Sequence, residues 1–233
     1  MSYKNKNKNT QININEPVLI TNFNPKYYFH EKDIEKAKSK KKLLQMTDIG
    51  KYSITKPIHT LWIKKNIISY FKQRKLNTHY LSIIDCNAGI GGDSISFSKY
   101  FKHVLAIEKN KVHYNVLINN CNVIGIKNIE FKNNNFMDIV DKPSIYKTYN
   151  ILFMDPPWGG PNYKKHDTVN LDIELDTKSK PLDEVINQLY KYYQFIILKS
   201  PVNLKFDEKK FKYKNITLIK EENNKILLII FEK

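Results

Sequence analysis

Short apolar runs alternate with segments of helical periodicity from about residue 80 to the end of the chain. The runs predict strands at 80–84, 104–107, 129–131, 151–154 and 195–198, and the segments between them predict helices at 93–101, 111–123 and 181–192. Strands and helices that alternate in this way form a largely parallel sheet with helices on both faces. Two last runs, 216–219 and 226–231, are separated only by a turn, and they predict a hairpin with one antiparallel strand at the sheet edge. We therefore expect an α/β fold.

The length of 233 residues suits one domain with its own core. Residues 1–15 are rich in lysine and asparagine and are predicted to be disordered. The segment 31–44 has helical character, and 58–71 is apolar at helical spacing. We therefore divide the chain into a basic, partly helical N-terminal extension, 1–45, and one domain, 46–233.

The formal net charge of +16 predicts an anionic partner such as a nucleic acid, although lysine-rich codon bias is an equally good explanation. The basic stretch 36–42 is interpreted as a solvated helix face, with a nuclear import signal or a phosphate-binding arm as alternatives. No run of about 18 apolar residues exists and the first residues are polar, so neither a membrane span nor a secretory signal is expected. Cys86 and Cys121 have no framework spacing, which predicts reduced packing residues in an intracellular protein.

The segment 155–161 reads Asp-Pro-Pro-Trp-Gly-Gly-Pro and directly follows the apolar run at 151–154. The prolines lack a backbone N–H and fix φ, so the carbonyls around them are free to face a ligand. Asp155 and the Pro156 carbonyl can accept the two N–H groups of an exocyclic amine, while Trp158 stacks on the ring that carries it. The segment thus predicts a site that aims the amine of a planar base at an electrophile. For the tetrapeptide alone, the alternative is a proline-rich loop with a core tryptophan.

A second candidate segment, 85–92, lies where the first predicted strand meets a helix and reads Asp-Cys-Asn-Ala-Gly-Ile-Gly-Gly. Glycines here let the backbone approach a ligand closely. The spacing resembles a dinucleotide fingerprint, but its first glycine is absent and the acid precedes the glycines. Asp85 would repel a pyrophosphate and attract a cationic cofactor with an amino group, which favours S-adenosylmethionine over NAD. The six histidines are scattered, so no metal site is predicted.

Polar residues also follow the next two predicted strands. Glu108 ends the second strand, where an acid can accept both hydroxyls of a ribose. Asn135 and Phe136 follow the third strand, where an adenine edge would lie. Each signal is weak alone, but their order along the chain, ending in Asp-Pro-Pro-Trp at the fourth strand, supports one cofactor site.

These segments resemble class I S-adenosylmethionine-dependent methyltransferases, and more narrowly the trimethylguanosine synthase family, which methylates the exocyclic N2 amine of a 7-methylguanosine RNA cap. The more specific motif is Pro-Pro-Trp-Gly-Gly-Pro-Asn-Tyr at 156–163, because Gly-Gly-Pro after the tryptophan is rare among other amino-methyltransferases. The segments 53–55, 200–203 and 223–225 resemble further landmarks, so the likeness covers about 45–233. It implies a Rossmann-like, seven-stranded fold and an RNA cap guanine-N2 methyltransferase that makes 2,7-dimethyl- or 2,2,7-trimethylguanosine. It also implies a monomer acting on capped RNA, in the nucleus of a cell or in the host cell of a virus.

The resemblance also implies site residues. On the cofactor side these are Thr55, Asp85, Asn87, Gly89, Glu108, Asn135, Phe136 and Asp155, with Asp85 and Gly89 at the methionine end, Thr55 near its carboxylate, Glu108 at the ribose, and Asn135 and Phe136 at the adenine. The implied catalytic residues are Asp155, Pro156 and Trp158, and the implied substrate-binding residues are Trp158, Pro161 and Asn203.

Two positions depart from the family's pattern. The family usually has aspartate where Asn135 stands; an amide oxygen can still accept from the adenine amine, but without a charge, and Asp138 is the alternative partner. Some members have serine at the position of Asp155, which favours an orienting role for this carboxylate over that of an obligatory base.

Two other functions stay open. One is methylation of an internal base, either adenine N6 or guanine N2. Against it, the RNA adenine family with this tetrapeptide has it before the cofactor motif, and ribosomal guanine-N2 enzymes usually have tyrosine after the prolines. The other is a cap-binding module without catalysis.

Overall fold

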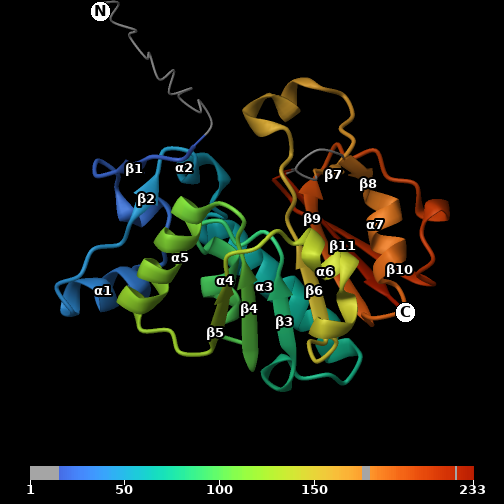
Figure 1. Ribbon diagram of the computed structural model, residues 1–233, viewed down its shortest axis with the longest axis horizontal. Helices are drawn as coiled ribbons and strands as arrows, with labels where there is room; N and C mark the ends of the chain where they lie inside the picture. The colour runs from blue at the N-terminus through green and yellow to red at the C-terminus, as the bar shows by residue number, and fades with distance from the viewer. Residues whose placement is uncertain (1–15, 175–178, 224) are drawn as a thin grey trace, which may run out of the picture.

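The computed structural model describes residues 16–174, 179–223 and 225–233, and its centre is a seven-stranded sheet (Figure 1). The strands lie in the order β10-β11-β9-β6-β3-β4-β5. Their bounds are β3 (Ser82–Asp85), β4 (His103–Ile107), β5 (Ile129–Lys132), β6 (Ile151–Met154), β9 (Phe195–Pro201), β10 (Asn215–Lys220) and β11 (Ile226–Glu232). All seven predicted strands are present, and all pairs that do not involve β11 are parallel. The predicted α/β sheet is confirmed.

The C-terminal strand, β11, is antiparallel as predicted, but it is not at the edge of the sheet, which corrects the prediction of its position. β11 lies between β9 and β10 and is antiparallel to both, so β10 forms the edge. The side chains explain this order. Residues 226–231 of β11 are apolar and buried, which is typical of a central strand that is covered on both faces. By contrast, β10 carries exposed residues at alternating positions, as an edge strand can.

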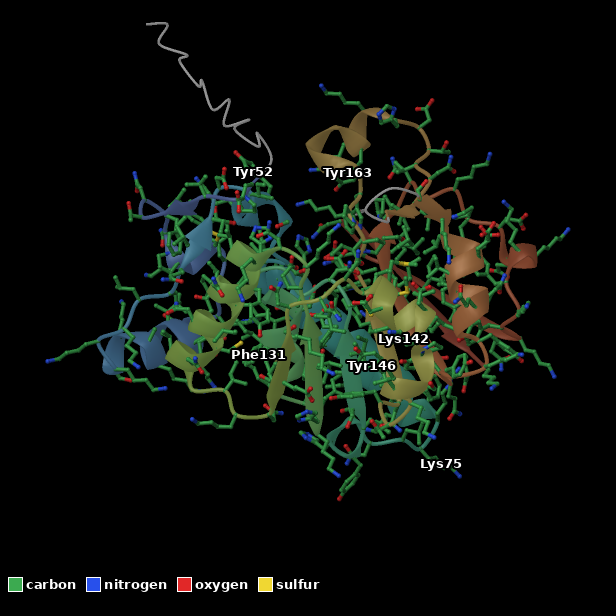
Figure 2. All side chains as sticks on the ribbon, in the orientation of Figure 1. Tyr52, Lys75, Phe131, Lys142, Tyr146 and Tyr163 are labelled. Carbon is green, nitrogen blue, oxygen red and sulfur yellow. The ribbon has the colours of Figure 1, made fainter. Side chains whose placement is uncertain are left out.

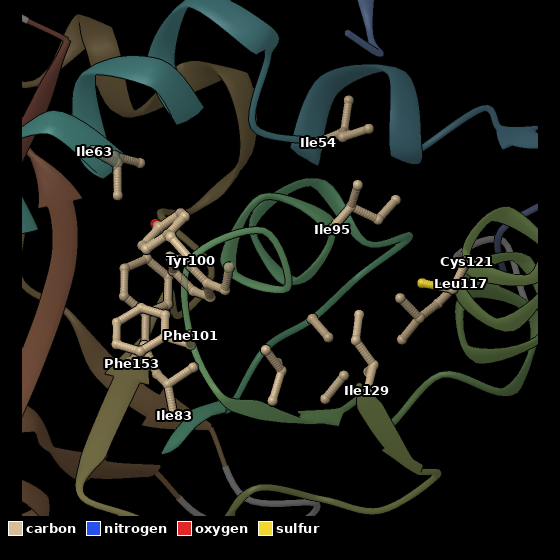
Figure 3. Packing of buried hydrophobic residues seen from close by; sticks show 14 of the residues in the cluster. Ile54, Ile63, Ile83, Ile95, Tyr100, Phe101, Leu117, Cys121, Ile129 and Phe153 are labelled. Carbon is tan, nitrogen blue, oxygen red and sulfur yellow. The ribbon is translucent and has the colours of Figure 1, made fainter. Parts of the chain in front are cut away.

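Helices cover both faces of the sheet. On one face lie α3 (Pro57–Gln73), α4 (Gly92–Phe97) and α5 (Lys111–Ile124); on the other lie α6 (Met137–Asp141), η3 (Pro143–Tyr146) and α7 (Leu182–Leu189). Neighbouring strand residues point to opposite faces, so Ile83 packs with the first layer and Ile84 with the second. Figure 3 shows part of the first layer; in this layer the ring of Phe153 of β6 meets the ring of Phe97 of α4 edge-on, with centroids 4.8 Å apart.

Helix α5 shows how local sequence sets an element's ends. The side-chain oxygen of Asn110 accepts from the backbone N–H groups of Val112 and His113, which caps the first turn. Gly125 ends the helix in the left-handed conformation, with φ of 84°. Because α5 connects the carboxyl end of β4 to the amino end of β5, Gly125 lies at the amino edge of the sheet.

The described part of the N-terminal extension packs beside α5 (Figure 1). It consists of β1 (Leu19–Ile20), η1 (Pro25–Tyr27) and α1 (Glu31–Ser39). β1 pairs with β2 (Met46–Thr47), which lies just after the predicted boundary and precedes α2 (Gly50–Ser53). Phe29, Ile34 and Ala37 are buried in the core. The helix predicted at 31–44 ends at Ser39, and Lys41 has a positive φ of 53°. The disorder predicted for 1–15 lies outside the described residues, and the boundary at residue 45 stays a prediction.

The remaining elements are short: η2 (Thr78–Tyr80), η4 (Gly160–Lys165), the antiparallel pair β7 (Asp172–Glu174) and β8 (Ser179–Pro181), and η5 (Glu208–Lys210). Cys86 and Cys121 are buried, and no disulfide joins them. Within the described ranges, no helix combines the length and the apolar character needed to cross a bilayer.

Candidate active site

The predicted site residues gather at the carboxyl edge of the sheet. Asp85, Glu108 and Asp155 each end or directly follow one of three neighbouring parallel strands, β3, β4 and β6. Figure 2 gives the orientation: Tyr52 and Tyr163 are labelled at the end of the molecule where this edge lies, and Lys75, which precedes β3, is labelled at the opposite end. Parallel strands bring their carboxyl ends to one edge, and open α/β sheets bind ligands there.

Asp85 is a buried carboxylate with one unused oxygen. Its Oδ2 accepts a hydrogen bond from Ser94 Oγ of α4 at 2.5 Å, and its Oδ1 has no partner among the described residues. Burial, and next the negative charge of Asp93, raise the pKa of Asp85 to about 7. The group is therefore poised to carry a proton or to bind a cation.

The glycine loop after β3 is held by the acid after β4. Glu108 accepts hydrogen bonds from the backbone N–H groups of Gly89, at 2.8 Å, and Asn110, at 2.7 Å. Burial raises the pKa of Glu108 although these two donors act to lower it. Gly89 has φ of +54°, and a Cβ at this position would meet nothing within 4 Å. The loop thus faces open space beside a carboxylate.

The loop after β6 is tied to the same region. The side-chain oxygen of Asn87 accepts from the backbone N–H of Asp155 at 3.3 Å. Pro156 is buried, and Trp158 is half-buried and packs against both core layers. The predicted cofactor segment and the predicted base-binding segment therefore adjoin.

Trp158 is held from the side by η4. The ring of Tyr163 meets the indole edge-on, with centroids 5.2 Å apart and planes at 87°. Asn203, which follows β9, donates from its side-chain amide to the carbonyls of Tyr163 and His166. Asn203 thus fixes the loop that supports Trp158. Pro161 lies in η4, and its side chain is outside the described part of the structure.

A buried lysine that the sequence did not indicate joins the two loops. Lys199, in β9, is 3% exposed, and its Nζ donates to Asp155 Oδ2 at 2.5 Å, to Thr55 Oγ1 at 2.6 Å and to Asp93 Oδ2 at 3.0 Å. The hydroxyl of Thr55 also donates to Asp93 at 2.6 Å. All three ammonium protons are therefore used in hydrogen bonds.

The charges of this network alter its own ionisation. Burial raises the pKa of Asp155 to about 6, with Lys199 opposing that rise and Asp93 adding to it. Burial acts to lower the pKa of Lys199, but the carboxylates of Asp155 and Asp93 outweigh it and the pKa is raised. Lys199 is therefore a cation at neutral pH.

The two residues predicted at the adenine lie before α6. The side-chain oxygen of Asn135 accepts from the backbone N–H of Met137, the first residue of this short helix, at 3.1 Å. Phe136 is buried in the second core layer. No described contact joins either residue to Asp85 or Asp155, so their place in the site stays a prediction.

Three residues of the site escaped the sequence reasoning: Asp93, Ser94 and Lys199. Asp93 and Ser94 open the helix after the glycines, and their position next to that motif was a usable signal. Lys199 interrupts an apolar run, and such a lysine is normally a solvated strand end. Among the described residues, no cluster of His, Cys, Asp and Glu has the arrangement of a metal site.

Comparison with known proteins gives the family. The family model described as RNA cap guanine-N2 methyltransferase matches residues 80–231, more than half of the chain, and spans both candidate segments. This chain belongs to the RNA cap guanine-N2 methyltransferase family. Its cofactor is S-adenosylmethionine, as predicted.

Members of the family and related proteins share parts of this sequence. An uncharacterized protein of Acanthamoeba polyphaga mimivirus is 32% identical over 154 residues, covering 66% of this chain and 59% of that protein. Trimethylguanosine synthase of Saccharomyces cerevisiae is 28% identical, covering 52% and 38%, and that of Schizosaccharomyces pombe is 30% identical, covering 48% and 45%. The matched part therefore spans about 38% to 59% of these relatives.

Two solved structures align with about three quarters of this chain, at low sequence identity and with TM-scores just below 0.5. A putative methylase from Haemophilus influenzae has a TM-score of 0.49 at 17% identity and covers 74% of this chain and 97% of its own. A putative methyltransferase from Escherichia coli has a TM-score of 0.48 at 17% identity, covering 78% and 88%. Together with the sheet order, the family confirms the class I, Rossmann-like methyltransferase fold.

Proposed function

We propose that this enzyme methylates the exocyclic N2 amine of 7-methylguanosine at the cap of an RNA, giving the 2,7-dimethyl or 2,2,7-trimethyl product. The observation that carries the proposal is the position of Asp155 and Trp158. A carboxylate and a half-buried indole follow β6 together, and Asn87 ties them to the cofactor loop. An amine acceptor and a stacking surface thus adjoin a methyl-donor site.

The residues at the glycine loop fit S-adenosylmethionine. The unpartnered Oδ1 of Asp85 suits a cationic group, and the open space at Gly89 lets a ligand approach the backbone. Glu108 uses one lone pair of each oxygen for the loop and retains others for ribose hydroxyls. We assign Asp85, Asn87 and Gly89 to the methionine end, Glu108 to the ribose, and Asn135 and Phe136 to the adenine.

The hydroxyl of Thr55 donates to Asp93 and accepts from Lys199, so we assign it to the support of the site; its predicted place near the carboxylate of the cofactor stays a prediction. For the substrate, we assign stacking to Trp158, and we assign Asn203 to the loop that carries it.

Positioning and charge explain how these residues would act. When bound, S-adenosylmethionine supplies a methyl group on a sulfonium, which the amine takes up as the carbon–sulfur bond breaks. Trp158 favours the 7-methylated ring because that ring is cationic, and cation–π attraction contributes about 0.5 to 2 kcal/mol. Asp155 and the Pro156 carbonyl accept the amine hydrogens and aim the nitrogen lone pair. Directly after the transfer, the methylated amine is positively charged and is a strong acid, so water can take its proton. Asp155 therefore needs only to orient the amine.

A methyl-transfer assay tests the proposal. The purified chain receives labelled S-adenosylmethionine and either 7-methyl-GDP, GDP or an uncapped adenosine-containing oligonucleotide. Label on 7-methyl-GDP alone is the expected result. Label on the oligonucleotide alone would move the function to internal bases. Binding of 7-methyl-GDP without any transfer would indicate a binding module.

A further inference from the structure

We propose that Lys199 is a positioning residue for methyl transfer. It keeps the Asp155 carboxylate ionised and oriented to accept the substrate amine, and it links this carboxylate to Asp93 of α4, the helix that follows the glycine loop. This inference rests on the proposed function, because it names a further residue of the same site. Neither the family match nor the motifs of the sequence assign a role to this lysine.

The sheet register places Lys199 beside Asp155. In the parallel pair β6–β9, Met154 lies opposite Leu198. Asp155 and Lys199 are the next residues after these two, so they lie side by side. Lys199 is 3% exposed, and a buried ammonium is unfavourable unless its donors are satisfied. Its three hydrogen bonds, to Asp155, Thr55 and Asp93, satisfy all of them. The lysine is therefore built into the site and is not a solvated side chain.

Lys199 engages only part of Asp155. It donates to Oδ2, and the aspartate side chain keeps 18% of its surface exposed. The remaining exposed surface is the part that a substrate amine can reach. The ammonium also lies 5.9 Å from the centroid of the Trp158 ring. One cation thus contacts the hydrogen-bond acceptor and lies near the stacking surface that the proposed substrate needs.

Three carboxylates, of which Asp85 and Asp93 are buried and Asp155 is partly exposed, lie around this single ammonium. Asp93 and Asp155 bind Lys199 directly, and Asp85 lies on the neighbouring strand β3, close enough to Asp155 and Asp93 for their charges to interact. Without Lys199, these groups would repel one another in a region of low dielectric constant, and Asp155 would hold its proton more tightly. A protonated Asp155 has one acceptor oxygen fewer and no charge, so it would orient the amine poorly.

The test compares four variants with the full-length chain: Lys199→Met, Lys199→Arg, Asp155→Asn and the double variant Lys199→Met/Asp155→Asn. Lys209→Met, an exposed lysine in η5, is the matched control for loss of one charge. Circular dichroism checks folding. The kcat and KM for 7-methyl-GDP are measured from pH 6 to 9, and the Asp155 carboxyl carbon is titrated by NMR.

For Lys199→Met, we expect kcat at pH 7 to fall at least about tenfold, with recovery toward pH 9, because removal of the neighbouring cation raises the pKa of Asp155 from about 6 by about two pH units or more. Lys199→Arg should keep more activity than Lys199→Met. The double variant should lose no more than Asp155→Asn, because both changes remove one function. An unchanged pH profile in Lys199→Met, or additive losses in the double variant, would overturn the proposal.

The NMR titration separates this inference from the proposed function. If the wild-type chain does not methylate 7-methyl-GDP, the proposed function fails. The midpoint of the Asp155 titration still reports on Lys199: an upward shift in Lys199→Met supports the coupling, and an unshifted midpoint refutes it. The double variant removes Lys199 and the charge of Asp155 together, and normal folding of this variant and of Lys199→Met would show that their losses of activity do not arise from unfolding.

Discussion

Glu108 accepts a hydrogen bond from the backbone N–H of Gly89 at 2.8 Å, so the acid that ends one strand holds the glycine loop of its neighbour. The same carboxylate is assigned to the cofactor ribose. We expect Glu108→Gln to lower the affinity for S-adenosylmethionine about tenfold, because hydrogen bonds to a charged group contribute about 1.5 to 3 kcal/mol. Isothermal titration calorimetry measures this affinity. Glu130→Gln, on the adjacent strand and exposed, is the control and should bind normally.

Replacement of Trp158 should separate substrate binding from cofactor binding. Stacking of a base on an aromatic side chain contributes about 1 to 3 kcal/mol. We expect Trp158→Ala to abolish transfer to 7-methyl-GDP while its affinity for S-adenosylhomocysteine stays within about twofold. Trp158→Phe keeps a smaller ring and should be intermediate. Full activity of Trp158→Ala would refute the stacking model.

Two glycines of the cofactor loop should respond differently to alanine. Both have a positive φ, which costs a non-glycine residue about 1 to 2 kcal/mol. A Cβ at Gly91 would also lie 2.7 Å from Leu117, whereas a Cβ at Gly89 faces open space. We expect Gly91→Ala to lower the free energy of unfolding more than Gly89→Ala. Gly89→Ala should lose cofactor affinity with only a modest loss of stability. Urea unfolding and calorimetry measure both effects, and the opposite order would contradict the structure.

The stability of the cofactor-free protein should depend on the ionisation of Asp85. Its pKa is about 7 in the native state, compared with 3.8 when unperturbed, so the native state binds the proton more tightly than the unfolded state. The resulting stabilisation is complete below about pH 4 and is lost as the pH rises to about 7, by an amount on the order of a few kcal/mol. Asp85→Asn has no such proton, so its unfolding free energy should fall less between pH 5 and pH 8. Equal pH dependence of the two proteins in urea unfolding would show that Asp85 stays ionised.

The lysines that meet the RNA phosphates should be those of η4 rather than those of the basic stretch 36–42. Lys40 approaches Gly125 at the amino edge of the sheet, opposite the site, whereas Lys164 and Lys165 follow Trp158 and are exposed. We expect Lys164→Ala/Lys165→Ala to raise KM for capped RNA several-fold at low salt, and less at high salt. The matched control is Lys36→Ala/Lys38→Ala, two exposed lysines of α1. If Lys36→Ala/Lys38→Ala raised KM by the same factor, the total positive charge of the protein, and not the position of Lys164 and Lys165, would explain the effect.

Local patterns predicted the larger elements because each carried its own signal. The strands are apolar runs of four to seven residues, and α5 has a capping asparagine and a terminating glycine. Elements such as α6, of five residues, and β1 and β2, of two residues each, are too short to show a period, and they form because tertiary contacts hold them. β10 lies at the edge because the side chains of β11 are buried and β11 takes the inner position. The turn between the two strands predicts a hairpin but not which of its strands lies at the edge.

The residues of the candidate site also differ in whether the sequence alone could predict them. Asp85, Glu108 and Asp155 could be found from the sequence because each follows an apolar run, and parallel strands must bring such residues to one edge. Lys199 could not be found, because it lies 44 positions from Asp155 within a run that local propensity assigns to an ordinary strand. Only the pairing of Met154 with Leu198 brings the ammonium to the carboxylate, and only the fold brings Thr55 and Asp93 to the same ammonium. Strand register is decided by contacts across the whole sheet, which no local stretch of sequence contains.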